Sequence, residues 1–82
     1  MLTIYSKKNC PQCEQAKALL NRKHIMFEEI SIDQDPIARQ FIISAGHRTV
    51  PQIYNSGKLF VEGGYSGLAK LADTEFNQLI EG

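Results

Sequence analysis

Cys10-Pro11-Gln12-Cys13 is the stretch from which the rest of this sequence is interpreted. Proline suits the first position of a helix, because the N–H that it lacks has no partner there. We therefore expect Cys10 to cap a helix that starts at Pro11 and runs to about Arg22. Two cysteines one turn apart share a helix face, with Cα atoms about 5.5 Å apart, which suits a reversible disulfide.

The two cysteines are predicted to have different roles. At the cap, Cys10 faces unpaired N–H groups and the positive end of the helix dipole, which lower the pKa of its thiol. Cys10 is therefore the predicted nucleophile. Cys13, one turn deeper, is expected to keep its proton longer and to act as the resolving thiol. Lys7, Lys8 and Lys17 lie nearby, and Lys7 is the one expected to favour the thiolate further. For Lys8 and Lys17, a solvated surface charge with little effect is the favoured interpretation.

A Cys-x-x-Cys pair also occurs in zinc sites, so the spacing alone is ambiguous. A structural zinc site needs four ligands, and the other candidates, His24 and His47, lie singly in the sequence. We therefore favour redox chemistry and predict neither a bound metal nor a bound cofactor. A non-enzymatic metal-binding module is the alternative.

Hydrophobic spacing on either side of the pair predicts alternating strands and helices. Strands are expected over residues 2–6, 27–32, 50–54 and 58–62, and helices over 11–22, over 36–45 and, in two pieces, over 66–80. A strand, a helix and a strand in succession imply parallel pairing, whereas the turn Asn55-Ser56-Gly57 implies an antiparallel hairpin. The predicted fold is α/β, with a four-stranded mixed sheet flanked by helices in the order βαβαββα.

Capping residues and apolar stripes add detail to the later helices. Asp35 is the expected N-cap of the middle helix, and Gly46 is expected to end it. Asp73-Thr74 is expected to restart the last helix. Apolar side chains at helical spacing are predicted to be buried: Ile37, Phe41 and Ile42 in the middle helix, and Leu68, Leu71, Phe76, Leu79 and Ile80 in the last segment.

Length and composition limit the classes of function. The chain of 82 residues is long enough for one domain with a small core. Nine basic and nine acidic residues balance, so neither nucleic acid nor a membrane surface is an expected partner. The sequence shows no signal peptide and no run of about 18 apolar residues, and we expect a cytoplasmic monomer. A disulfide between two cysteines this close together closes too short a loop to stabilise the fold.

Several motifs together resemble those of the glutaredoxins and extend over nearly the whole chain. They are Ile4-Tyr5, Lys7, Cys10-Pro11-Gln12-Cys13, Ala16-Lys17-Ala18-Leu19-Leu20, Thr49-Val50-Pro51-Gln52-Ile53 and Gly63-Gly64. The resemblance implies one glutaredoxin domain over residues 1–82, with a thioredoxin-like fold and thiol–disulfide oxidoreductase activity. It also implies a cis bond before Pro51, which would turn the Val50 backbone toward an extended cysteinyl peptide.

Glutathione is the co-substrate that this resemblance implies. Its glycyl carboxylate is expected to meet Lys7, and its glutamyl end the helix that follows Gly63-Gly64, where free N–H groups attract a carboxylate. Arg48 is a further candidate for a substrate carboxylate. The candidate substrate-binding residues are Lys7, Gln12, Thr49, Val50, Pro51, Gly64, Tyr65 and Ser66.

The sequence departs from the common family pattern, Gly-Gly-x-Asp-Asp, at Tyr65-Ser66-Gly67, although Ser66 is still expected to cap a helix. This run, with Gln12 between the cysteines, resembles glutaredoxin-like redoxins that serve ribonucleotide reductase and draw electrons from thioredoxin reductase. Two sources of electrons therefore remain open. We favour glutathione as the reductant, with disulfide-containing proteins such as ribonucleotide reductase as partners.

Overall fold

The computed structural model describes the main chain of residues 1–81 and the side chains of residues 1–79. Its elements follow the predicted order, with the last helical segment in two pieces. They are β1 (Leu2–Ser6), α1 (Pro11–Arg22), β2 (Phe27–Ser31), α2 (Pro36–Ser44), β3 (Gln52–Asn55), β4 (Lys58–Leu59), α3 (Tyr65–Ala69) and α4 (Asp73–Glu81). None of the described helices is long and apolar enough to cross a membrane.

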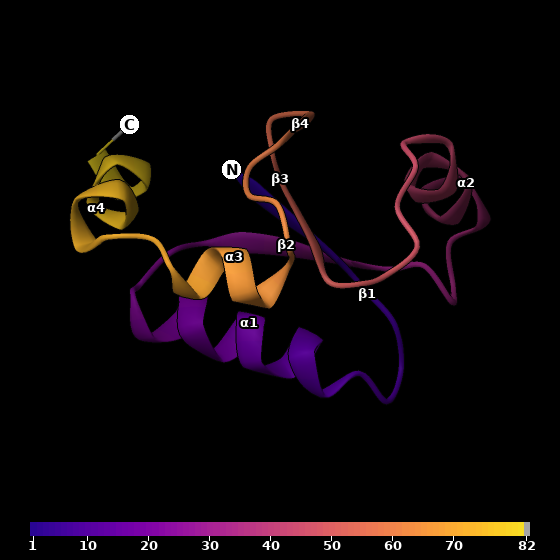
Figure 1. Ribbon diagram of the computed structural model, residues 1–82, viewed down its shortest axis with the longest axis horizontal. Helices are drawn as coiled ribbons and strands as arrows, with labels where there is room; N and C mark the ends of the chain where they lie inside the picture. The colour runs from indigo at the N-terminus through magenta and orange to yellow at the C-terminus, as the bar shows by residue number, and fades with distance from the viewer. Residues whose placement is uncertain (82) are drawn as a thin grey trace.

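The four strands form one mixed sheet in the order β2-β1-β3-β4 (Figure 1). β1 runs parallel to β2 and antiparallel to β3, and β4 is antiparallel to β3. Ile4 in β1 is opposite Glu29 on one side and Ile53 on the other. The predicted α/β architecture is therefore confirmed, and β1, which leads into the cysteine pair, lies inside the sheet.

Helices pack on both faces of this sheet. α1 and α3 lie side by side in Figure 1 and cover the face that contains the main core. The fully buried members of that core are Leu2, Ile4, Ala16, Leu20, Ile53 and Leu68. On the other face, Phe41 of α2 packs against Tyr5 and Tyr54, with ring centroids 5.6 and 5.2 Å away.

Four strand boundaries differ from those predicted, one of them the end of β3, which lies at Asn55 instead of residue 54. β2 ends one residue early at Ser31, although Ile32 N–H still donates to the Ser6 carbonyl at 2.9 Å. β3 begins at Gln52 because Pro51 has no N–H for the ladder. β4 ends at Leu59, and only one more ladder bond follows, from Phe60 N to Ile53 O at 2.8 Å. The chain then leaves the sheet and turns back toward Pro51.

The buried stripe of α2 was predicted wrongly at two positions, Ile37 and Phe41. Ile42 is buried at 3% exposure and Phe41 is 40% exposed, but Ile37 is 84% exposed. Asp35 caps the helix as predicted and accepts a 3.0 Å hydrogen bond from Ala38 N–H. Ala38 and Ile42, four residues apart, are the buried residues of the helix, and Ile37 lies on another side, in solvent.

The starts of the last two helices also differ from prediction. Ser66 does not cap α3, because the helix begins at Tyr65 and Gly64 occupies the cap. Asp73 is the first residue of α4 and pairs with Lys23 at 2.7 Å instead of capping. The predicted burial of the apolar residues in this segment is largely confirmed. Leu68 and Phe76 are buried, and Leu71 and Leu79 pack against the core. The Ile80 side chain lies outside the described residues.

Ile42→Ala and Ile37→Ala remove the same atoms from the two sides of α2. We expect Ile42→Ala to lower the free energy of unfolding by about 2–4 kcal/mol, because it leaves a cavity against the sheet. Ile37→Ala is expected to change it by less than about 0.5 kcal/mol. Urea denaturation of the two variants measures both values, and equal losses would contradict the orientation of α2.

Candidate redox site

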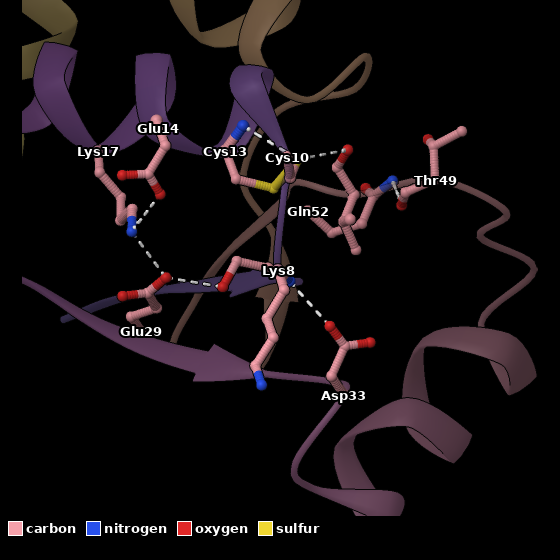
Figure 2. The surroundings of a disulfide bond; sticks show 11 residues. Lys8, Cys10, Cys13, Glu14, Lys17, Glu29, Asp33, Thr49 and Gln52 are labelled. Atoms are coloured by element: carbon pink, nitrogen blue, oxygen red, sulfur yellow. Dashed lines mark hydrogen bonds and ion pairs between the residues drawn. A yellow bond between two sulfur atoms is a disulfide. The ribbon is translucent and has the colours of Figure 1, made fainter.

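Cys10 and Cys13 form a disulfide at the start of α1 (Figure 2). Their Cα atoms are 5.2 Å apart, as one helical turn allows. Cys10 is the N-cap, and its Sγ accepts a 3.2 Å hydrogen bond from the Cys13 backbone N–H. Cys10 is 6% exposed whereas Cys13 is fully buried, so an incoming disulfide meets Cys10 first. The predicted cap and the predicted difference in depth are both confirmed.

The segment before β3 lies next to this disulfide. Cys10 Sγ is 3.8 Å from the carbonyl oxygen of Val50, and the Val50–Pro51 bond is cis, as the family resemblance implied. Within the described part of the chain, the Val50 N–H donates to no protein acceptor. A backbone donor and a backbone acceptor are therefore available within a few ångströms of the reactive sulfur.

Gly64 packs directly against Pro51. Its φ of +59° suits glycine, and a Cβ there would lie 2.6 Å from the Pro51 carbonyl oxygen. No other residue fits without displacing one of the two segments. The contact joins the start of α3 to the segment beside Cys10, and it gives the Gly63-Gly64 motif a packing role.

Two grooves meet at Lys7. The first, which we call the cationic groove, encloses about 510 Å³ and is lined by residues that include Lys7, Arg39, His47, Arg48, Thr49 and Val50. The second encloses about 840 Å³, reaches Cys10 and Pro11, and is lined by charges of both signs. Lys7 is exposed and lines both grooves. Arg39 was missed in the sequence, because only the docking of α2 brings it there.

A sequence model described as Glutaredoxin matches residues 2–60, which include both cysteines and all four strands. The chain belongs to the glutaredoxin family. It is accordingly a thiol–disulfide oxidoreductase whose redox pair is the Cys-x-x-Cys motif.

Two relatives of the chain are named differently. The chain is 42% identical to the glutaredoxin-like protein NrdH of Lactococcus lactis over 72 residues, which is 88% of this chain and 100% of the relative. It is 46% identical to glutaredoxin 3 of Escherichia coli K12 over 52 residues, which is 62% of this chain and 63% of the relative.

Solved structures support the same fold. The structure of a buckwheat glutaredoxin–glutathione complex superposes with a TM-score of 0.71 at 26% identity, covering 98% of this chain and 73% of that one. The NrdH-redoxin of Escherichia coli superposes with a TM-score of 0.72 at 24% identity, covering 95% and 92%. The thioredoxin-like fold predicted for this glutaredoxin is thus confirmed.

The lysines around the disulfide differ in their surroundings. Lys17 pairs with Glu14 at 2.6 Å and with Glu29 at 2.9 Å. The hydrogen bond to Glu14, and then that to Glu29, raise the pKa of Lys17, while Lys17 and then Ser6 lower the pKa of Glu29. Its charge is therefore balanced locally, as Figure 2 shows. This agrees with the interpretation of Lys17 as a charge with little effect on the thiolate, although its partner Glu29 on β2 could not be placed from the sequence.

The other predicted site residues lie in three places. Thr49 and Val50 line the cationic groove, while Gln12 is exposed on the first turn of α1 and lines neither groove. Tyr65 is half-buried against the core, and Ser66 is exposed in the first turn of α3. In the described residues, no group of three or more His, Cys, Asp or Glu side chains could hold a metal ion.

Gly67 is a residue whose role the sequence did not reveal. A Cβ on Gly67 would overlap the carbonyl oxygen of Glu62, so this glycine lets α3 lie against the chain that leaves β4. The glycine that departs from the common family pattern is therefore required by packing. The one feature of the sequence that could have indicated this role is the position of Gly67 shortly after Gly63-Gly64.

Gly64→Ala and Gly57→Ala separate the packing at Pro51 from the cost of a positive φ. Gly57 has a φ of +87° with nothing within 4 Å of an added Cβ, so its variant is expected to lose about 1–2 kcal/mol of stability. Gly64→Ala is expected to lose at least about 1 kcal/mol more, because the Cβ meets Pro51. Thermal unfolding of both variants measures the difference, and similar losses would contradict the close contact.

Proposed function

We propose that this glutaredoxin uses glutathione as its reductant and reduces protein disulfides and glutathione mixed disulfides. The observation that carries the proposal is the cationic groove, whose lining residue Val50 has its carbonyl oxygen 3.8 Å from Cys10 Sγ. Lys7, Arg39 and Arg48 supply three positive charges to the groove, against a single carboxylate, Asp33. That carboxylate already accepts a 2.8 Å hydrogen bond from the Lys8 backbone. A small peptide with a free carboxylate fits this distribution of charge.

The backbone of Val50 supports recognition of a cysteinyl peptide. An extended peptide that pairs with the Val50 N–H and C=O gains affinity from main-chain hydrogen bonds, whatever its side chains are. The Val50 carbonyl oxygen is 3.8 Å from Cys10 Sγ, so a cysteine held there has its sulfur close to the nucleophile. The start of α3, at Gly64, is proposed to bind the glutamyl end of glutathione through the free N–H groups of the helix start.

The proposed reaction moves two electrons from the dithiol to the substrate. The Cys10 thiolate attacks one sulfur of the substrate disulfide, which forms a mixed disulfide and expels the other sulfur as a thiolate. Cys13 then loses its proton and attacks Cys10 Sγ, which breaks the mixed disulfide and leaves the Cys10–Cys13 disulfide. Two glutathione molecules, oxidised to their disulfide, restore the dithiol. No bound cofactor takes part.

A redoxin that receives electrons from thioredoxin reductase and passes them to ribonucleotide reductase is the second candidate. The match to the NrdH protein of Lactococcus lactis over the whole length of that relative favours it. So does the first turn of α3, where Tyr65-Ser66-Gly67 includes no acidic residue to meet the ammonium group of glutathione. The two candidates share the same cysteine chemistry and differ in the reductant.

Steady-state assays with each reducing system test the proposal. We expect brisk reduction of a glutathione mixed disulfide with glutathione and glutathione reductase, and little with thioredoxin reductase. Lys7→Gln and Arg39→Gln are expected to raise KM about two- to fivefold each, as exposed charge pairs allow. Lys58→Gln, at the far end of the sheet on β4, is the matched control. Turnover only with thioredoxin reductase would establish the second candidate instead.

Serine variants of the two cysteines separate their roles. Cys10→Ser is expected to abolish all reduction, because the nucleophile is lost. Cys13→Ser is expected to keep the reduction of glutathione mixed disulfides, since glutathione itself can resolve the Cys10 intermediate, and to lose the dithiol reduction of protein disulfides. Rates with both substrates measure this difference, and equal losses in the two variants would mean that the roles are misassigned.

A further inference from the structure

We infer that Gln52 is a positioning residue, which holds the Thr49–Val50 peptide so that the Val50 N–H faces an incoming cysteinyl substrate. Gln52 Nε2 donates a 2.9 Å hydrogen bond to the Thr49 carbonyl oxygen, beside the disulfide (Figure 2). The inference rests on the docking of a cysteinyl main chain at Val50 that the preceding subsection proposes. It assigns the geometry of that docking to a side chain that itself touches no substrate.

The planarity of the peptide bond carries the argument. Val50–Pro51 is the cis bond here, and the Thr49–Val50 bond is trans. In a trans peptide, the C=O and the N–H of one plane point in opposite directions. The hydrogen bond from Gln52 holds the Thr49 C=O toward the Gln52 side chain. The Val50 N–H of the same plane must therefore point away from Gln52. This agrees with a Val50 N–H that has no acceptor among the described residues.

Burial of the Gln52 side chain stabilises its hydrogen bond to Thr49. The residue is only 6% exposed, so water cannot readily replace its hydrogen bond to Thr49. Gln52 is also the first residue of β3 and is held in the sheet opposite Tyr5. A side chain fixed by the central part of the sheet thereby fixes a peptide plane in the loop before it.

The rest of this loop is held elsewhere. His47 N–H donates to the Ile42 carbonyl at 3.1 Å, and the His47 ring Nε2 is 2.8 Å from the Tyr54 hydroxyl. Both bonds fix the start of the loop, two residues before Thr49. In the described structure, the bond from Gln52 is the one that holds the Thr49–Val50 plane itself.

The test compares a peptide disulfide with one that has no peptide group. Gln52→Met keeps the length of the side chain and removes the donor. In single-turnover reactions of the pre-reduced protein, we expect the rate constant with oxidised glutathione to fall about five- to tenfold, the net worth of one hydrogen bond. With bis(2-hydroxyethyl) disulfide, which cannot pair with Val50, we expect a change of less than about twofold, within the uncertainty of such comparisons.

Gln52→Glu adds a readout that a purely structural role would not move. The introduced carboxyl group cannot donate to the Thr49 carbonyl oxygen when it is ionised, whereas the protonated acid can. The ratio of the two rate constants of this variant, peptide disulfide over aliphatic disulfide, is therefore expected to rise toward the wild-type ratio as the pH is lowered. The same ratio should not change in this way for Gln52→Met.

Gln40→Met is the matched control, because Gln40 donates to Ser44 on the exposed side of α2. It should leave both rate constants unchanged. Equal losses with the two disulfides in Gln52→Met would overturn the inference, because they would indicate general loosening of the site. These reactions need no external reductant, so a failure of the glutathione assay would leave this test intact.

Discussion

The hydrogen bond from the Cys13 backbone N–H to Cys10 Sγ is the interaction on which the site depends. A helix start leaves backbone N–H groups without partners, and an N-cap side chain commonly satisfies one of them. Here the capping atom is the reactive sulfur, at 3.2 Å. The hydrogen bond that caps the start of the helix is therefore also the one that stabilises a thiolate on Cys10. Pro11 pins the position of the cap, since it fixes the first helical residue.

A second constraint comes from the approach of Gly64 to Pro51. These residues are far apart in the sequence, and the absence of a side chain at Gly64 lets their backbones meet. The contact fixes the start of α3 against the segment that presents Val50. Gly67 repeats the arrangement one turn later, against the Glu62 carbonyl. The redox pair, the Val50 backbone and the start of α3 are thus held together by close backbone packing, which few side chains would tolerate.

Features set by neighbours in the chain could be predicted from the sequence. The succession of strands and helices along the chain, the caps at Cys10 and Asp35 and the disulfide spacing depend mostly on residues close in the sequence. Features set by packing between distant elements could not. The ion pair of Lys17 with Glu29, on a strand 12 residues away, could not be predicted, and only Glu14 was seen as its neighbour. Arg39 and Gln52 were missed for the same reason.

The departure at Tyr65-Ser66-Gly67 bears less on the source of electrons than the sequence suggested. Gly67 is explained by its contact with Glu62, and Tyr65 by its packing against the core, and both requirements hold whichever reductant is used. What remains of the departure is the missing carboxylate at the start of α3. In the proposed binding of glutathione, that loss would weaken recognition of one end of the peptide, whereas the cationic groove and the Val50 backbone would meet the other end. The balance between the two reductants therefore depends on how much of the binding energy comes from the Val50 side of Cys10.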